Sequence, residues 1–159
     1  MKITILCVGK VKESFYRDAI AEYTKRMNKY AKMEIVEVAD EKTPDKISDT
    51  QKDQILEKEA ERILEKLDDN SLVVTLEIKG KSFTSEGFSK FIQNAGVSGV
   101  SHITFIIGGS LGLHRNVLAK SKQALSFSEM TFPHQLMRVI LLEQIYRAHR
   151  IMTNEPYHK

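Results

Sequence analysis

The stretch that decides the fold runs from His102 to Asn116 and reads HITFIIGGSLGLHRN. Its first half is a nearly unbroken apolar run with β-branched members, which is typical of a strand covered on both faces. Gly108 and Gly109 follow directly and indicate a turn in which the backbone comes close to another backbone or to a ligand. A strand buried on both faces predicts a parallel sheet with helices on either side.

The glycine turn also matches a catalytic pattern, because residues 108–112, GGSLG, fit the G-x-S-x-G elbow of serine hydrolases. Such an enzyme needs an acid and then a histidine after its serine, and Glu129 is the only carboxylate between Ser110 and His134. A P-loop requires a Lys-Ser or Lys-Thr pair directly after its glycines, and none follows here. The spacing of the glycines is also not the G-x-G-x-x-G of dinucleotide-binding sites. The sequence therefore disfavours these three classes of site.

Strand-like and helix-like segments alternate along the rest of the chain. Short apolar runs predict strands, and apolar residues spaced by three and four predict helices. The predicted strands are 2–9, 33–39, 71–78, 102–109 and 124–128, and the main predicted helices are 12–30, 54–67, 87–94 and 133–152, with a polar loop at 40–53. This alternation predicts an α/β sandwich around a mostly parallel sheet, formed by a single domain over residues 1–159.

Composition sets limits on the class of protein. The 159 residues carry a net charge of +3, with 42% hydrophobic and 28% charged residues, as expected of a globular domain. No apolar run is long enough to span a membrane, and the apolar start of the chain is interpreted as a first strand and not as a signal peptide. The single cysteine, Cys7, lies within that strand and is expected to be a core residue. These features favour a protein of the reducing cytoplasm with no membrane partner.

Three loops are expected to share one edge of the sheet. They follow the strands that end near Leu76, Gly108 and Ser128, and the last of them contains SFSEMTFPH. In open parallel sheets, ligands bind just beyond the carboxyl ends of the strands. The sequence therefore predicts a pocket at this edge.

Two stretches, FIIGGSLG at 105–112 and LSFSEMTFPHQLMRVILLEQIYRAHRIMTNEPYHK at 125–159, resemble the RlmH-type methyltransferases of the SPOUT superfamily. The resemblance covers the whole chain and is most specific in the patterns T-x-P-H-x-L-x-R, L-x-E-Q-x-Y-R-A and the terminal P-Y-H. It implies methylation of N3 of a pseudouridine in a stem-loop of 23S ribosomal RNA, with S-adenosyl-L-methionine as methyl donor and the assembled ribosome as substrate.

The same resemblance implies a C-terminal trefoil knot whose loops hold the cofactor. Proline often stands in the family where this chain has Ser110, so that serine is not expected to be a nucleophile. Knots are otherwise nearly absent from proteins, and no periodicity predicts one. The cofactor-binding residues implied by the resemblance are Leu76, Gly108, Phe127, Ser128, Glu129, Met130, Thr131 and Phe132.

The catalytic residues are expected on the last helix and in the tail. His134 and Arg138 are four apart and share a helix face, and a capping or packing role for His134 stays open. The resemblance assigns Tyr157 and His158 to substrate positioning or proton removal, and the group that takes the N3 proton stays open. Lys159 stands where the family usually has arginine, which leaves the role of that residue open.

The last helix, from Pro133 to Met152, is apolar around most of its circumference, and a homodimer with this helix in its interface is expected, with Leu142 as an outward position. Methyl transfer from a sulfonium needs no metal, and none is expected. Two alternatives stay open: a SPOUT methyltransferase with another RNA target, such as transfer RNA, and an RNA-binding module that is not an enzyme.

Overall fold

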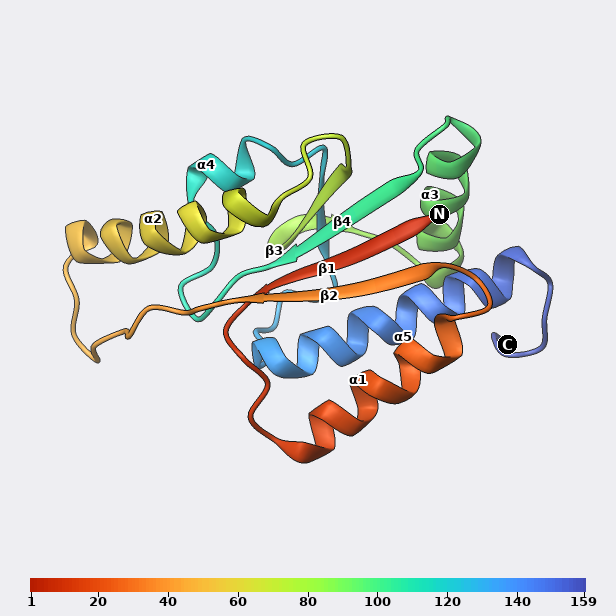
Figure 1. Ribbon diagram of the computed structural model, residues 1–159, viewed down its shortest axis with the longest axis horizontal. Helices are drawn as coiled ribbons and strands as arrows, with labels where there is room; N and C mark the ends of the chain where they lie inside the picture. The colour runs from red at the N-terminus through yellow and green to blue at the C-terminus, as the bar shows by residue number, and fades with distance from the viewer.

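The computed structural model describes residues 1–159 as one five-stranded sheet with helices on both faces (Figure 1). The strand order is β2-β1-β4-β3-β5, and every strand pairing is parallel, which confirms the predicted α/β architecture. The elements in chain order are β1 (Lys2–Val8), α1 (Ser14–Met27), β2 (Lys32–Val38), α2 (Asp49–Lys66), β3 (Leu72–Ser82), α3 (Ser85–Val97), β4 (His102–Ile107), α4 (Arg115–Leu118), β5 (Gln123–Ser126) and α5 (His134–Met152).

The sheet separates two apolar layers, because alternate residues of a strand point to opposite faces. Ile3 and Ile5 of β1 pack in the larger cluster, with residues of α1, α3 and α5. Leu6 and Val8 of the same strand pack in the smaller cluster, with residues of α2 and α4. All six residues of β4, the central strand, are buried, as the sequence predicted.

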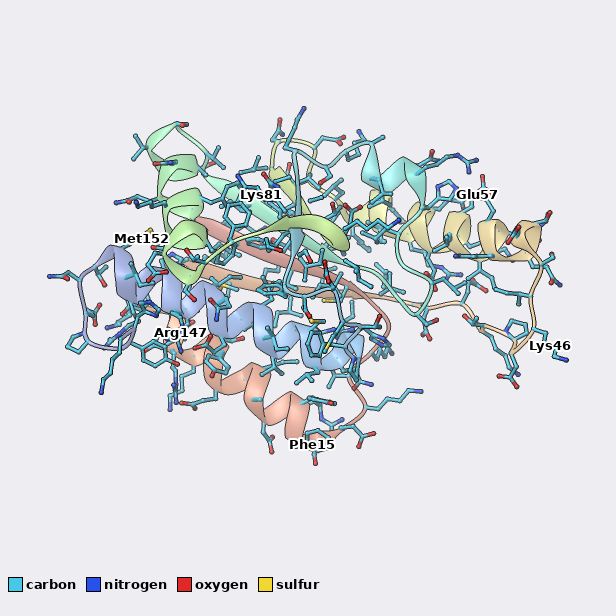
Figure 2. The ribbon with its side chains drawn as sticks, turned by 180° about the vertical axis from the view of Figure 1, so that it is seen from behind. Phe15, Lys46, Glu57, Lys81, Arg147 and Met152 are labelled. Carbon is cyan, nitrogen blue, oxygen red and sulfur yellow. The ribbon has the colours of Figure 1, made fainter.

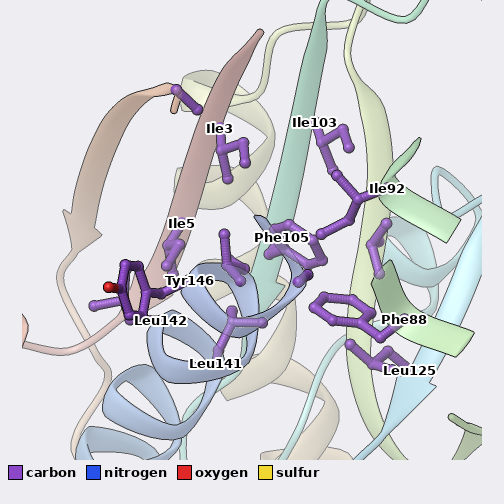
Figure 3. Close-up of a cluster of buried hydrophobic side chains, with 14 of the residues drawn as sticks. Ile3, Ile5, Phe88, Ile92, Ile103, Phe105, Leu125, Leu141, Leu142 and Tyr146 are labelled. Carbon is purple, nitrogen blue, oxygen red and sulfur yellow. The ribbon is translucent and has the colours of Figure 1, made fainter. Parts of the chain in front are cut away.

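The inner face of α5 forms part of the larger cluster (Figure 3). Leu142 belongs to this face and is 0% exposed, so the prediction that it points outward was wrong. The apolar residues of α5 occur on more than one side of the helix, so their spacing did not show which side faces the sheet. The packing of α5 on the sheet shows it. Leu136, Val139 and Ile140 are instead half-buried and lie outside both core clusters.

Several boundaries differ from prediction. The loop after β2 ends at Ser48 and not at Asp53, because Ser48 caps α2 through a reciprocal pair of bonds with Gln51. Strand β5 ends at Ser126, so residues 127–128 lie in the following loop. None of the helices is long and apolar enough to cross a membrane.

Candidate functional site

The carboxyl ends of the strands meet at one edge of the sheet, called the carboxyl edge below. The register places Thr75 of β3 beside Ile106 of β4, and Leu76 beside Leu125 of β5. The part of β3 that follows Leu76 and the loops after β4 and β5 therefore start side by side. This confirms that the three segments singled out in the sequence share one edge, although the first lies inside β3, which continues to Ser82.

The glycine turn after β4 is closed on itself. A Cβ atom on Gly108 would lie 2.5 Å from the carbonyl oxygen of Gly112, so only glycine allows the two backbones to come so close. Gly112 has a φ of +88°, and its N–H donates to the carbonyl of Gly109 at 3.1 Å. The exposed Ser110 has no side-chain hydrogen bond within the protein. The turn thus has a steric reason for its glycines and no hydrolase triad.

A second loop was missed by the sequence analysis. Strand β3 pairs with Leu125 twice, through Leu76 and again through Lys81, so residues 77–80 leave the ladder as a bulge. A Cβ on Gly80 would lie 2.8 Å from the backbone of residues 124 and 125, which explains how β3 rejoins β5. The hydroxyl of Ser126 donates to the carbonyl of Ile78 at 2.8 Å and fixes the bulge.

The β3 bulge and the loops after β4 and β5 enclose a cavity of about 470 Å³. This volume lies within the range of about 300–1,000 Å³ that is usual for small-molecule sites. Its wall is largely apolar, with glycine backbone on one side. Of the residues predicted to hold the cofactor, those that line the cavity are Leu76, Gly108, Phe127, Ser128, Met130, Thr131 and Phe132.

Glu129 is the exception, because it is exposed and does not line the cavity. Ser128 turns the chain at this point, and its hydroxyl accepts the N–H of Met130 at 3.0 Å. Met130 lines the cavity although its side chain is 74% exposed. Together with Ile78 and Leu118, it gives the wall several apolar side chains that are also open to solvent.

His134, the first residue of α5, lines the same cavity. Its Nε2 atom lies 3.5 Å from the position that a Cβ on Gly9 would take, so it sits at the end of β1. Burial lowers the pKa of His134 first, and the positive charge of Arg138 lowers it further, while Asp40 opposes both. The imidazole is therefore neutral near pH 7 and can accept a proton.

Arg138 does not reach the cavity. It is 1% exposed, and its guanidinium donates to Glu37 at 2.5 Å and to the carbonyl of Gly9 at 2.6 Å. Arg138, predicted as a catalytic residue, therefore cannot contact a phosphate at the surface, because its guanidinium is buried; its Nε has no hydrogen-bond partner within the protein. Arg138 joins α5 to the ends of β1 and β2.

The tail packs on the later part of α5 and on α3. The Tyr157 hydroxyl donates to Glu143 at 3.0 Å, and burial together with that carboxylate raises the pKa of Tyr157 to about 12. His158 lies 2.8 Å from Glu86 and 3.2 Å from Arg147 through its two ring nitrogens. Glu143 also forms an ion pair with Arg147, whose Nη2 donates to its Oε1 at 2.7 Å.

The tail is also anchored before Tyr157. Glu155 accepts from Lys29 at 2.8 Å and from Tyr30 at 2.7 Å, and these bonds lower the pKa of Glu155 to about 2. None of residues 143–159 lines the cavity, and Glu143 lies about 14 Å along the helix axis from His134 at the usual rise per residue. The tail is therefore held away from the cavity of its own chain.

The chain is similar to known proteins over its full length. A family model described as "Predicted SPOUT methyltransferase" matches residues 1–158. The chain belongs to the SPOUT methyltransferase family. A protein of Methanococcus maripaludis named "Putative ribosomal RNA large subunit methyltransferase H" is 62% identical over 100% of both chains. A ribosomal RNA large subunit methyltransferase H 1 of Clostridium perfringens is 57% identical, also over 100% of both.

A solved structure of another methyltransferase supports the fold of this SPOUT chain. It is described as a "putative methyltransferase" of Legionella pneumophila "in complex with the bound cofactor SAM". The TM-score is 0.50 at 9% sequence identity, with 93% of this chain and 66% of that chain covered. At this identity the likeness concerns the fold alone.

Within this SPOUT methyltransferase, the structure adds residues to the site that sequence reasoning missed. Ile78 and Lys79 of the β3 bulge and Leu113 of the glycine turn also line the cavity. Gly80 was the available signal for the bulge, since a glycine inside a strand pattern often marks one. No three His, Cys, Asp or Glu side chains lie together as a metal site would need, and the absence of a metal from the reaction stays a prediction.

Proposed function

We propose that this protein transfers a methyl group to large-subunit ribosomal RNA, at N3 of a pseudouridine in a 23S stem-loop of the assembled ribosome. The observation that carries the proposal is the match, over the full length of both chains, to relatives named ribosomal RNA large subunit methyltransferase H. The cavity at the carboxyl edge supports it, because it offers a small-molecule site where open parallel sheets bind their ligands. The reaction would take place in the cytoplasm, where the ribosomes are.

The cavity suits S-adenosyl-L-methionine as the methyl donor. Its volume of about 470 Å³ and its mixed wall of apolar side chains and backbone fit an adenine ring, a ribose and a short amino-acid chain. When bound, this cofactor supplies a methyl group on a positively charged sulfur. The Legionella pneumophila protein with the same fold was solved with this cofactor.

The lining residues divide into two kinds of contact. Leu76, Phe127 and Met130 would pack against the apolar faces of the base, while the backbone at Gly108 and at residues 127–132 would bind its polar edges. Glycine at Gly108 keeps the turn tight and leaves that side of the cavity without a side chain. A wall of this kind holds the donor in place, so that the acceptor nitrogen can be aligned with the methyl carbon.

The N3 proton must leave as the new bond forms. His134 is the residue of the cavity best suited to accept it, because its lowered pKa keeps the imidazole neutral at pH 7. The raised pKa of Tyr157 keeps that phenol protonated, so a positioning role suits it better than proton removal. Arg138 would act through the backbone of β1 and not on the RNA.

The tail would complete the site of a second copy. Tyr157 and His158 pack on the later part of α5, too far from the cavity to serve it in their own chain, so a role in catalysis requires a homodimer in which each tail contacts the partner's cavity. Leu136, Val139 and Ile140 are apolar side chains in the first half of α5 that lie outside the core, and they are the candidate contact face. An Ile140→Lys variant should sediment as a monomer, because burying an unpaired charge costs several kcal/mol.

A trefoil knot is also part of the proposal. Its support is the family itself and the contact between the β3 bulge and the end of β5, where the Ser126 hydroxyl donates to the carbonyl of Ile78. A knot would hold the walls of the cavity together more firmly than loops alone. Cleavage of the chain within residues 127–133 should then leave the two fragments associated until denaturant is added.

The test in cells is mass spectrometry of ribosomal RNA with and without the gene. The expected result is one 23S pseudouridine that carries a methyl group only when the gene is present. A methyl group lost from transfer RNA instead would favour a different RNA target. Unchanged RNA in both pools, with no binding of S-adenosyl-L-methionine by calorimetry, would favour an RNA-binding module without enzyme activity.

A further inference from the structure

The loop between β1 and α1, residues 9–13, is held by side chains from β2 and α5 and by Arg17 of the adjacent helix. Because these bonds satisfy its main-chain groups, the backbone of this loop is fixed while its own side chains are left out of the packing. The contacts are Val11 N–H to Glu37 Oε2 at 2.9 Å, Lys12 N–H to Gln135 Oε1 at 3.0 Å, Arg138 Nη2 to the Gly9 carbonyl at 2.6 Å and Arg17 Nη1 to the Lys12 carbonyl at 2.8 Å.

The side chains that this loop presents have no partners of their own. Lys10 and Lys12 are exposed and take part in no ion pair, whereas many other cations of the chain do. Phe15, in the first turn of α1, is 61% exposed, and its ring contacts only Tyr16 among the aromatic residues, at 4.3 Å between centroids. Figure 2 shows Phe15 at the outer margin of the molecule, projecting away from the helices.

The loop lies directly beside the candidate cavity. Gly9, its first residue, approaches Nε2 of His134, and His134 lines the cavity. Gln135, which binds the amide of Lys12, is the next residue of α5. A molecule that enters the cavity from solvent would therefore have the lysines and Phe15 close to the rest of its length.

We infer that residues 10–17 form an RNA-contacting surface, on which single-stranded nucleotides next to the target base place their phosphates against Lys10 and Lys12 and one base against Phe15. The inference rests on the proposed function, because it takes RNA as the substrate. Unpaired cations beside an exposed aromatic ring suit unstacked RNA, whose bases stack on aromatic side chains. Glu13 is the one carboxylate within this stretch, which leaves the surface positive.

The test compares three variants in binding to ribosomes and in methyl transfer. Lys10→Ala with Lys12→Ala should raise the KM for ribosomes about tenfold and flatten the plot of log affinity against log salt by about one unit or more, since each phosphate contact contributes about 0.7 to that slope for single strands. Phe15→Ala should weaken binding several-fold without changing the slope, because stacking releases no counterions. Phe15→Tyr should restore binding.

A matched control is Lys25→Ala with Lys32→Ala, which removes two exposed, unpaired lysines remote from the cavity, at the end of α1 and the start of β2. Calorimetry should show unchanged S-adenosyl-L-methionine binding in every variant. An unchanged salt slope in the Lys10/Lys12 variant, or an equal change in the control, would overturn the inference. Binding is measured by co-sedimentation without cofactor, so an inactive wild-type protein would count against the proposed function alone.

Discussion

The amino edge of the sheet has polar groups that bind one another, whereas the carboxyl edge has a cavity that can bind a ligand. At the amino ends of the strands, Thr4 Oγ1 lies 2.9 Å from His102 Nε2, and His102 Nδ1 lies 3.1 Å from Asp68. This is the order of groups found in a hydrolase triad. Yet Thr4 is 5% exposed and His102 is 8% exposed, and neither lines the cavity. At the carboxyl edge, polar side chains such as Lys79, Thr131 and His134 instead line an open cavity.

Whether an edge of the sheet can bind a substrate therefore depends more on open space than on which polar groups are present. A hydroxyl, an imidazole and a carboxylate that satisfy one another inside the protein hold the strands in register and leave no room for a substrate. The carboxyl edge instead has glycines, a bulge and a half-buried histidine around a cavity.

Replacing Gly108 by valine should abolish methyl transfer by closing the cavity. The new Cβ would meet the Gly112 carbonyl, so the turn must shift. We expect S-adenosyl-L-methionine affinity to fall by a factor on the order of a hundred, with a native circular dichroism spectrum, because the turn lies outside the buried strands. The control is Gly96→Ala in α3, where only the flexible end of Met1 is close. Undiminished affinity in the Gly108 variant would refute the role of the turn.

Removing His158 and Lys159 should lower methyl transfer by a factor on the order of a hundred while cofactor affinity stays nearly unchanged, since positioning or proton transfer is lost and the cavity is not. Tyr157 is kept because its ring packs on Tyr146 at 5.0 Å between centroids. A loss of cofactor affinity along with activity would place the tail in the cofactor site.

Mixing this truncated chain with the Gly108→Val chain tests whether each tail serves the cavity of the partner subunit. A mixed dimer has one intact cavity, on the truncated copy, and one intact tail, on the other copy. Partial recovery of methyl transfer is expected if each tail serves the partner's cavity. No recovery, with mixed dimers demonstrated by mass spectrometry, would contradict a tail shared between subunits.

His134→Gln should lower kcat by about ten- to a hundredfold, at the lower end of what a general base contributes. Because burial lowers the pKa of His134 below 6.5, the wild-type rate should be level near pH 7 and fall only as the pH drops through the lowered value. The variant should lack this acid limb. A variant with the wild-type pH profile would show that another group takes the proton.

Thr4→Val should leave methyl transfer unchanged and lower the free energy of unfolding by about 1–3 kcal/mol, the usual cost of a buried polar group left without its partner. The substitution keeps the shape of the side chain and removes the hydroxyl that His102 binds. Denaturant unfolding measures the stability, and a ribosome assay at low temperature measures the activity. A large loss of activity in a folded variant would show that the amino edge takes part in methyl transfer.

Local patterns predicted the strands and the loops of the cavity well. The buried run before Gly108 and the long loop before His134 correctly predicted that the cavity lies at the carboxyl edge. Strand periodicity and the backbone freedom of glycine are local properties, so a short stretch of sequence is enough to show them. The sequence could not reveal that Leu142 faces inward or that Arg138 is buried against Glu37, since both depend on how α5 is turned on the sheet. The β3 bulge was missed because its cause, the approach of Gly80 to β5, lies more than forty residues away along the chain.

The most direct measurement of the central claim is an in vitro reaction of the purified protein with ribosomes and methyl-labelled S-adenosyl-L-methionine, followed by mapping of the label by mass spectrometry. The account predicts one label per ribosome, on N3 of a 23S pseudouridine, and none with the Gly108→Val protein. Label on transfer RNA alone, or equal labelling by the Gly108→Val protein, would contradict it.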